Sequence, residues 1–540
     1  MIKQHIILFF LAFCAFTLQA QDTELETGEV DVIKNFDARL LESNLINVNP
    51  NLPPLDTTTR RQSYDVKSKS IEVDYLPPKI RPLAMKGDAL QKSYNGYARL
   101  GGGTPTAFFG EASYHIAPSD QFSMDLNLLH QSANNNNNVE NQRFSYNNAN
   151  IDGTYYFDQG FAVNGRLGYT SDIVHFYGYN QLSDTLSFDK DAVRQRFSTF
   201  DLGATIFNGT RTEADFNYSA GLDFYFLEDN YAARENGIDI KVNGTKWFND
   251  KHPLSITLRT DFTSYRDTAD QSLNNLYLQP NFTYHGDIFK VKIGANLASN
   301  SDNISFFPDL EVAANIVNGI VTAYIGATGD LQKNNFRNLT DFNPFLSSRV
   351  TLKNASYFKY YAGIRGTYQG FDYDIQASLK SIDDLALFLA SQDSIPRFNV
   401  LYDTASIFTI KASATTALFN GFELTGTIGQ NIYTLDREEK AWHLPSLTAN
   451  VAARYKTLEN QLQIFGELYF ENGLPFLNSE NGEAENLNAL FDLSLGAEFF
   501  FTENIGIYAQ LNNLANNKRE RWHRYPTYGL NFLFGVSARF

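Results

Sequence analysis

Apolar and polar residues alternate at every second position in several stretches of this chain. In the clearest stretch, every second residue from Tyr528 to Phe540 is apolar, and residues such as Asn531 and Arg539 lie between them. Because neighbouring side chains of a strand point to opposite faces, this pattern predicts a strand with one apolar face. Further stretches with the same pattern are 254–262, 447–456 and 491–501.

Short turns and long polar loops alternate between the predicted strands. Several of the short turns contain Asn-Gly or a similar pair that tolerates positive φ. The short turns are expected at 158–160, 285–287, 317–319, 369–370, 420–421, 458–460 and 502–504. The longer loops are expected near 134–142, 180–193, 266–274, 330–356, 435–445, 471–486 and 513–526. A transmembrane β-barrel has this asymmetry, whereas a β-sandwich has no reason to keep it in phase.

The strand count and the absence of an apolar helix together define the predicted fold. No stretch beyond the first 20 residues has the roughly 20 unbroken apolar residues that a spanning helix needs. We therefore predict an all-β fold, a large antiparallel transmembrane β-barrel of about 22 strands over 91–540, with 18 or 20 strands as alternatives. An even count places both termini in the periplasm if the barrel lies in the cell outer membrane. A lumen this wide either conducts or is filled by something else.

The beginning of the chain predicts a signal peptide over residues 1–20. Lys3 supplies the positive end, an apolar run follows, and the small residue Ala20 precedes the expected cleavage site. The lone cysteine, Cys14, falls inside that run, so we expect a mature chain without disulfides or thiolate metal sites.

Residues 21–90 are expected to form an extended periplasmic segment, because six prolines interrupt any strand or helix there. A short run in this segment alternates apolar residues and could add a strand to another sheet, which suggests a periplasmic or lipoprotein partner. A plain linker is the alternative. The candidate partner-binding residues are Val30, Val32, Ile33 and Phe36.

The composition narrows the classes of function. The chain has 45 Phe and 30 Tyr but only 19% charged residues, which suits a wall that contacts outer-membrane lipid. A net charge of −16 argues against a nucleic-acid partner, since phosphate binding needs clustered basic residues. The histidines lack metal-ligand spacing and no Gly-x-Ser-x-Gly elbow occurs, so we expect neither an enzyme nor a cofactor. Residues 101–105 lack the Lys of a phosphate loop and predict a tight hairpin.

One predicted loop, 513–526, concentrates basic residues beside Trp522 and His523. Such a loop could contact the phosphates of lipopolysaccharide, and a charged rim beside the interfacial aromatic belt is the alternative. The candidate lipopolysaccharide-contacting residues are Lys518, Arg519, Arg521 and Arg524.

Two parts of the chain resemble known outer-membrane proteins. Residues 505–514, Ile-Gly-Ile-Tyr-Ala-Gln-Leu-Asn-Asn-Leu, followed by 525–540, resemble the closing strands of TonB-dependent receptors, which implies a 22-stranded barrel. The front, at 28–40, 77–78 and 90–103, is similar to a TonB-dependent receptor-like family of Bacteroidota. The resemblance also implies an aromatic signal for the outer-membrane assembly machinery, carried by Tyr528, Phe532, Phe534 and Phe540.

The resemblance implies a channel or a transport-associated protein, with one departure. TonB-dependent receptors carry a folded plug domain before the barrel, and residues 21–90 are too few and too rich in proline to match one. The expected protein is therefore a plugless, porin-like relative of these receptors. The alternative is a non-conducting scaffold of a larger envelope complex, in which 21–90 bind a partner or fill the lumen.

Overall fold

The computed structural model describes residues 94–183, 185–210, 212, 214–300 and 303–540. The predicted signal peptide, the extended segment and its residues Val30, Val32, Ile33 and Phe36 lie outside the described residues.

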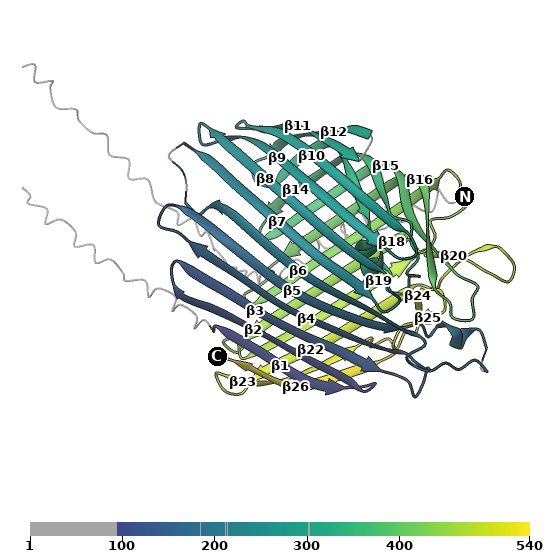
Figure 1. Ribbon diagram of the computed structural model, residues 1–540. Coiled ribbons are helices and arrows are strands. Elements are labelled where there is room, and N and C mark those ends of the chain that lie inside the picture. Colours follow the sequence, from purple (N-terminus) through teal and green to yellow (C-terminus); the bar gives the residue numbers. More distant parts are fainter. Residues whose placement is uncertain (1–93, 184, 211, 213, 301–302) are drawn as a thin grey trace, which may run out of the picture. The chain divides into compact units, whose positions relative to one another are not determined.

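Twenty-two antiparallel strands form one closed sheet, which confirms the predicted barrel and its strand number (Figure 1). Each strand of the sheet pairs with the next along the chain, and the last pairs with the first. The first eleven strands are β1 (Gly96–Gly103), β2 (Ala107–Ser119), β3 (Phe122–Asn134), β4 (Arg143–Tyr156), β5 (Phe161–His175), β6 (Arg194–Asn208), β7 (Phe216–Asp229), β8 (Arg234–Phe248), β9 (His252–Arg266), β10 (Asp270–His285) and β11 (Phe289–Asn300). The others are β12 (Asn303–Val317), β13 (Val321–Asn334), β14 (Lys353–Tyr368), β15 (Phe371–Ala390), β16 (Phe398–Thr416), β17 (Phe422–Leu435), β18 (Leu447–Thr457), β19 (Leu462–Asn472), β22 (Leu490–Phe500), β23 (Ile505–Asn512) and β26 (Asn531–Arg539).

Short elements lie in the connections between these strands. They are the 3-10 turn η1 (Gly178–Gln181), helix α2 (Phe336–Phe342), and the strand pairs β20 (Pro475–Leu477) with β21 (Ala484–Asn486) and β24 (Glu520–Trp522) with β25 (Tyr525–Pro526). Neither α2 nor any other helix within the described ranges has the length and apolarity needed to cross a membrane.

The outer face of the wall is apolar, as the alternation predicts. On β26, Phe532 and Phe534 are 47% and 53% exposed, whereas Leu533 between them is 9% exposed. Exposed rings and aliphatic side chains on one face of each strand suit contact with acyl chains.

The inner face carries ion pairs between neighbouring strands. Arg99 on β1 lies 3.1 Å from Glu111 on β2, and Lys292 on β11 lies 2.6 Å from Asp309 on β12. Charged pairs on this face give the lumen a polar lining, which is the arrangement expected for a water-filled barrel interior.

Short turns lie at one end of the barrel and most of the long loops at the other, as predicted. The backbone groups of Gly96 and Phe540 exchange hydrogen bonds of 2.8 and 2.9 Å, so the start of β1 and the chain end lie together at the short-turn end. The loop predicted at 266–274 is much shorter, because β9 and β10 continue to Arg266 and Asp270 and leave only 267–269 between them. The glycine-rich segment ends in the expected tight connection at 104–106.

Candidate functional site

The outer part of the β13–β14 hairpin turns away from the barrel wall. The β12–β13 ladder reaches Asp309 and Thr328 but goes no further, and the β14–β15 ladder begins only at Tyr357 and Ile382. Between these points, β13 and β14 pair only with each other. We call residues 329–356 the inner hairpin, because they contact β6, β8 and β9, which are not their neighbours in the sheet, as well as Asp384 on the nearby β15.

Helix α2, in the connection of the inner hairpin, docks on β6 and β8. The Arg337 guanidinium donates hydrogen bonds of 2.6 and 3.3 Å to the two carboxylate oxygens of Asp201 on β6. Glu235 on β8 accepts hydrogen bonds from the backbone N–H groups of Phe336 and Arg337, at 2.6 and 3.1 Å. A carboxylate at a helix N-terminus satisfies N–H groups that have no partner within the helix and opposes the positive end of the helix dipole. The helix is therefore held against strands that lie far from β13 in the sheet order.

Other polar contacts fix the rest of the inner hairpin on β9 and β10. The Lys333 ammonium binds the Asp261 carboxylate and lies 3.1 Å from the Thr263 hydroxyl, both on β9. Gln271 on β10 donates to the Val350 carbonyl at 2.8 Å and accepts from the Leu352 N–H at 2.9 Å. These contacts are side-chain hydrogen bonds and ion pairs. The inner hairpin also forms a short parallel bridge with β16, in which the Ser347 N–H donates to the Phe398 carbonyl at 2.8 Å and the Phe398 N–H donates to the Phe345 carbonyl at 2.9 Å. Release of the hairpin therefore breaks this bridge but leaves the ladders of the wall in place.

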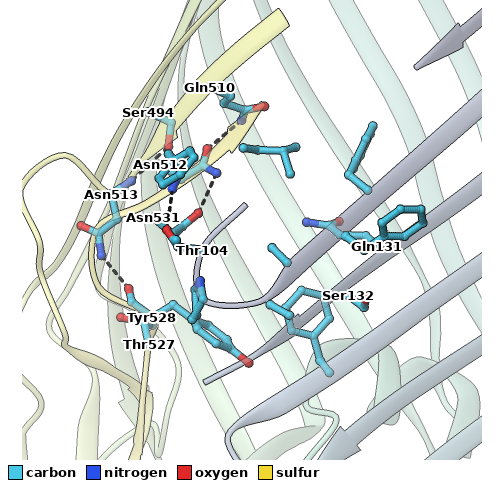
Figure 2. Close-up of a pocket in the computed structure, with 18 of the residues that line it drawn as sticks. Thr104, Gln131, Ser132, Ser494, Gln510, Asn512, Asn513, Thr527, Tyr528 and Asn531 are labelled. Atoms are coloured by element: carbon cyan, nitrogen blue, oxygen red, sulfur yellow. Dashed lines mark hydrogen bonds between the residues drawn. The ribbon is translucent and has the colours of Figure 1, made fainter. Parts of the chain in front are cut away.

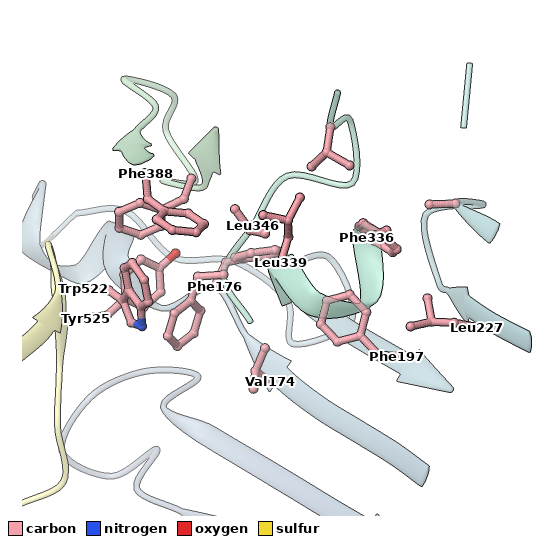
Figure 3. Packing of buried hydrophobic residues seen from close by; sticks show 14 of the residues in the cluster. Val174, Phe176, Phe197, Leu227, Phe336, Leu339, Leu346, Phe388, Trp522 and Tyr525 are labelled. Atoms are coloured by element: carbon pink, nitrogen blue, oxygen red, sulfur yellow. The ribbon is translucent and has the colours of Figure 1, made fainter. Parts of the chain in front are cut away.

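The loops at the same end share one buried apolar cluster, which we call the mouth cluster (Figure 3). Phe345 of the inner hairpin stacks on Tyr525 of β25 with ring centres 3.9 Å apart. Trp522 meets the ring of Phe398 edge-on at 5.3 Å. Burial of these rings stabilises the packing of the loops at this end of the barrel. Its members are Val174, Phe176, Tyr177, Tyr179, Val193, Phe197, Leu227, Ala233, Tyr265, Leu273, Phe336, Leu339, Phe345, Leu346, Val350, Leu352, Phe388, Phe398, Trp522 and Tyr525.

His443, in the loop between β17 and β18, is buried against the mouth cluster. Its Nδ1 donates to the Phe388 carbonyl at 2.8 Å, and its ring stacks on Trp522 at 5.5 Å. The pKa of His443 is lowered to about 3, mainly because the ring is buried and to a smaller extent because of the nearby charges of His523 and Arg521. The folded loops therefore hold a neutral imidazole at neutral pH.

Acid is expected to loosen these loops through His443. An unfolded loop takes up a proton below about pH 6.5, whereas the folded loop resists it until about pH 3. The stabilisation is complete above pH 6.5 and is lost as the pH falls, by about 2 to 3 kcal/mol at about pH 4.5. Limited proteolysis of the reconstituted barrel at neutral and acid pH measures this. A His443→Asn variant should lose most of the pH dependence, whereas His115→Asn, on the exposed part of β2, should keep it.

The basic residues predicted to contact lipopolysaccharide fall into two groups. The Arg521 guanidinium lies 2.7 Å from the Glu471 carboxylate and 4.6 Å from the centre of the Trp522 ring, so it takes part in packing the mouth loops. The Arg524 side chain donates to the Ser479 hydroxyl at 3.1 Å. Lys518 and Arg519 are exposed to solvent. Contact with lipopolysaccharide stays a prediction for this loop.

The aromatic residues of the predicted assembly signal lie at both ends of β26. Tyr528 precedes the strand and meets the Phe144 ring edge-on at 5.9 Å. Phe532 and Phe534 lie on the exposed face, and Phe540 stacks on Tyr114 at 5.7 Å. Their role in assembly stays a prediction.

Two cavities border the lumen, one near the mouth and one near the middle of β4 to β7, and neither was predicted from the sequence. One, of about 360 Å³, lies beside the 104–106 turn and is rich in amides and hydroxyls (Figure 2). There, Gln510 donates to Asn512 at 2.7 Å and Asn512 donates to Asn531 at 2.9 Å. Such a surface can hydrogen-bond a polar, uncharged solute.

The second cavity, of about 460 Å³, is lined by charged groups that include Asp152, Arg166, Asp201, Asp223 and Arg337. It lies directly against α2, because Arg337 is one of its walls. Neither cavity contains a metal site, since no group of three or more His, Cys, Asp or Glu residues within the described ranges could hold an ion.

Comparisons with known proteins identify the fold. No protein-family model matches the chain, and no curated protein matches its sequence. The FrpB iron transporter from Neisseria meningitidis matches with a TM-score of 0.63 and 9% identity, over 84% of this chain and 82% of its own. The pyoverdine outer membrane receptor FpvA from Pseudomonas aeruginosa PAO1 matches with a TM-score of 0.62 and 11% identity, over 84% and 79%. The ferric-catecholate import receptor Fiu from E. coli K12 gives 0.61 and 8%, over 83% and 82%.

Identities this low show a shared fold and nothing more. The barrel is therefore similar in architecture to iron transporters and siderophore receptors, of which FpvA is an outer-membrane protein by name. Together with the transmembrane β-barrel, this similarity supports an outer-membrane location.

Proposed function

We propose that this protein is a transport-associated outer-membrane barrel whose lumen is the solute path and whose inner hairpin is the gate. It is, on this proposal, a plugless relative of the TonB-dependent receptors of Bacteroidota, has both termini in the periplasm, and is not an enzyme. The solved structures with a similar fold include an iron transporter and an import receptor, which supports a role in transport.

The observation that carries the proposal is the docking of α2 on β6 and β8. A barrel of this width has a lumen that wall side chains cannot fill. The inner hairpin places a helix and its flanking loop across that lumen, and the Arg337–Asp201 ion pair holds the helix there. Because the barrel supplies its own lumen-crossing element, it does not depend on a separate plug domain for closure.

Breaking the Arg337–Asp201 pair is expected to open the gate. In planar bilayers, Arg337→Gln should raise the frequency of open events roughly tenfold, because a partly desolvated, bidentate pair contributes more than about 1 kcal/mol. The doubly substituted protein, Arg337→Asp with Asp201→Arg, should return toward the original closed behaviour.

The matched control is Arg166→Gln. Arg166 lines the same cavity and pairs with Asp223 on β7, but it does not contact the inner hairpin through that pair. Its loss should leave the opening frequency unchanged. If all four proteins fail to conduct, the transport proposal is wrong and the non-conducting scaffold is favoured.

A further inference from the structure

The inner hairpin leaves the outer end of β12 without a partner on one side. β12 pairs with β11 from Asn303 to Ala314, but its ladder with β13 begins only at Asp309. Over 303–308, β12 is therefore paired with β11 alone among the described strands. We call this unpaired edge the wall gap.

The β13 side of the wall gap is satisfied by side chains. Extending the β12–β13 register would place Gly329, Leu331 and Lys333 opposite Pro308, Phe306 and Ile304. The replacement contacts are Asn296 Nδ2 to Gly329 O at 3.3 Å, Leu331 N to Asp330 Oδ1 at 2.7 Å and Asn338 Nδ2 to Lys333 O at 2.8 Å. The β13 side of the wall gap therefore has hydrogen bonds that replace those of a ladder with β12.

On the β12 side of the wall gap, no such replacement contact is present among the residues that the structure describes. Proline has no N–H to donate, so Pro308 marks the point beyond which a ladder bond is lost in any case. In an antiparallel sheet, the N–H and C=O groups of every second residue of a strand point to the same neighbouring strand. By the extended register, the main-chain groups of Ile304 and Phe306 face the gap.

Apolar surface lies on both sides of the wall gap. Outside, Ile304 and Phe306 are 81% and 61% exposed, which is more than Leu310 at 41% on the same face of β12. Inside, a buried apolar cluster stands in a lumen that is otherwise lined by charged pairs. The members of this cluster are Tyr277, Ala298, Phe307 and Leu331.

A buried polar atom without a partner lies beside this cluster. Asn296 is 5% exposed and uses its amide nitrogen on Gly329 and Asp330, and its Oδ1 atom has no hydrogen-bond partner within the described residues. A buried acceptor of this kind costs free energy unless a donor reaches it.

We propose that the wall gap is a lateral binding site for a membrane amphiphile with an acyl chain and a hydrogen-bonding head group. The acyl chain lies across Ile304 and Phe306, and the head group bonds the Asn296 amide oxygen and the main-chain groups of β12 that have no partner among the described residues. Hydrocarbon alone cannot satisfy backbone N–H and C=O groups, but the polar head of an amphiphile can. This site opens to the membrane and is separate from the solute path through the mouth.

Site-directed labelling from within the bilayer tests the proposal. Ser305→Cys, at the wall gap, is compared with Ser413→Cys on β16, where the wall is paired on both sides. Both serines are half-buried. Ser305 lies between the exposed Ile304 and Phe306, and Ser413 lies an odd number of positions from the exposed Ile410 on the same strand, so both serines lie on the lumen side. The background is Cys14→Ser, since Cys14 is the one cysteine of the sequence. The probe is a phospholipid with a maleimide at the end of its acyl chain, in phosphatidylcholine vesicles.

We expect Ser305→Cys to be labelled roughly tenfold faster than Ser413→Cys. This ratio corresponds to a difference of about 1.4 kcal/mol in the free energy needed to expose the thiol to the probe. Equal rates would overturn the proposal. Adding Ile304→Asn and Phe306→Asn should lower the rate at Ser305→Cys toward that of Ser413→Cys, whereas Leu310→Asn should not. Equal labelling by a soluble maleimide in denaturant checks that both thiols are reactive.

A pair of cysteines tests the competing arrangement, in which β13 pairs with β12 over 303–308 and closes the wall gap. In the extended register, Phe306 lies opposite Leu331. Phe306→Cys with Leu331→Cys should stay reduced in the resting barrel under mild oxidation. Ready disulfide formation would show that β13 returns to β12 and would contradict a lateral site.

Discussion

Replacing residues 335–352 with a two-residue Asn-Gly turn is expected to give a barrel that conducts continuously. Asn334 and Lys353 are directly paired across the hairpin, so a type I′ turn can join them without disturbing the ladder. The change removes α2 and its contacts with Asp201 and Glu235, and it leaves a lumen too wide for side chains to fill. Planar-bilayer recordings should show a mean conductance roughly ten times that of the unmodified protein.

A second loop provides the matched control for this truncation. The segment 478–483 joins β20 and β21, where Leu477 and Ala484 are directly paired and could be joined by the same Asn-Gly turn. The residues at its tip are exposed and stand apart from the mouth cluster. Shortening it should leave the conductance unchanged. A truncated inner hairpin that conducts no better than this control would mean that the barrel is closed elsewhere.

Removing the Glu235 carboxylate is expected to undock α2. The carboxylate accepts four hydrogen bonds, from the Tyr225 hydroxyl, the Asn335 amide and the N–H groups of Phe336 and Arg337. In Glu235→Ala these donors lose their partner in a buried site, at a cost of about 1 to 3 kcal/mol for each donor left unsatisfied. Hydrogen exchange of the α2 amides should therefore become at least roughly tenfold faster, since about 1.4 kcal/mol corresponds to one factor of ten.

The comparison with Glu228→Ala separates this effect from a general loss of negative charge. Glu228 on β7 is half-buried, with its side chain 39% exposed, and lies 3.9 Å from Arg234, a distance at which such a pair contributes little. Exchange in α2 should be unaffected by that change. Glu235→Gln, which keeps an acceptor oxygen, should fall between the two. Unchanged exchange in Glu235→Ala would show that α2 does not depend on this contact.

The barrel itself could be predicted because its signals are local. A side chain on a strand alternates with its immediate neighbours, and a tight turn needs only residues such as Asn420 and Gly421. Those signals gave the strand number and most of the turns. The error at 266–274 has a local cause as well, since polar residues at the end of β9 and the start of β10 resemble a loop in the sequence.

The inner hairpin could not be predicted, because long-range contacts hold it. The segment 330–356 resembles any other polar outer loop, and its partners Asp201 and Glu235 are more than ninety positions away in the sequence. Pro308 and Gly329 do carry a sequence signal for the end of the β12–β13 ladder. They would lie opposite each other if the ladder continued, and both residue types weaken strand pairing. The loop predicted near 134–142 is present, but its long-range contacts could not be predicted either. Its tip is exposed, but Asn135 is buried and the nearby Asn141 donates to the Tyr179 hydroxyl at 2.8 Å.

The pairing of β1 with β26 sets a condition on how the protein is made. β1 precedes and β26 follows every other strand of the sheet, yet they are neighbours from Tyr97 and Arg539 to Gly103 and Leu533. One edge of β1 therefore has no mate until β26 has been synthesised. A bare strand edge invites pairing with other chains, so a polypeptide that still lacks β26 is prone to aggregate through β1.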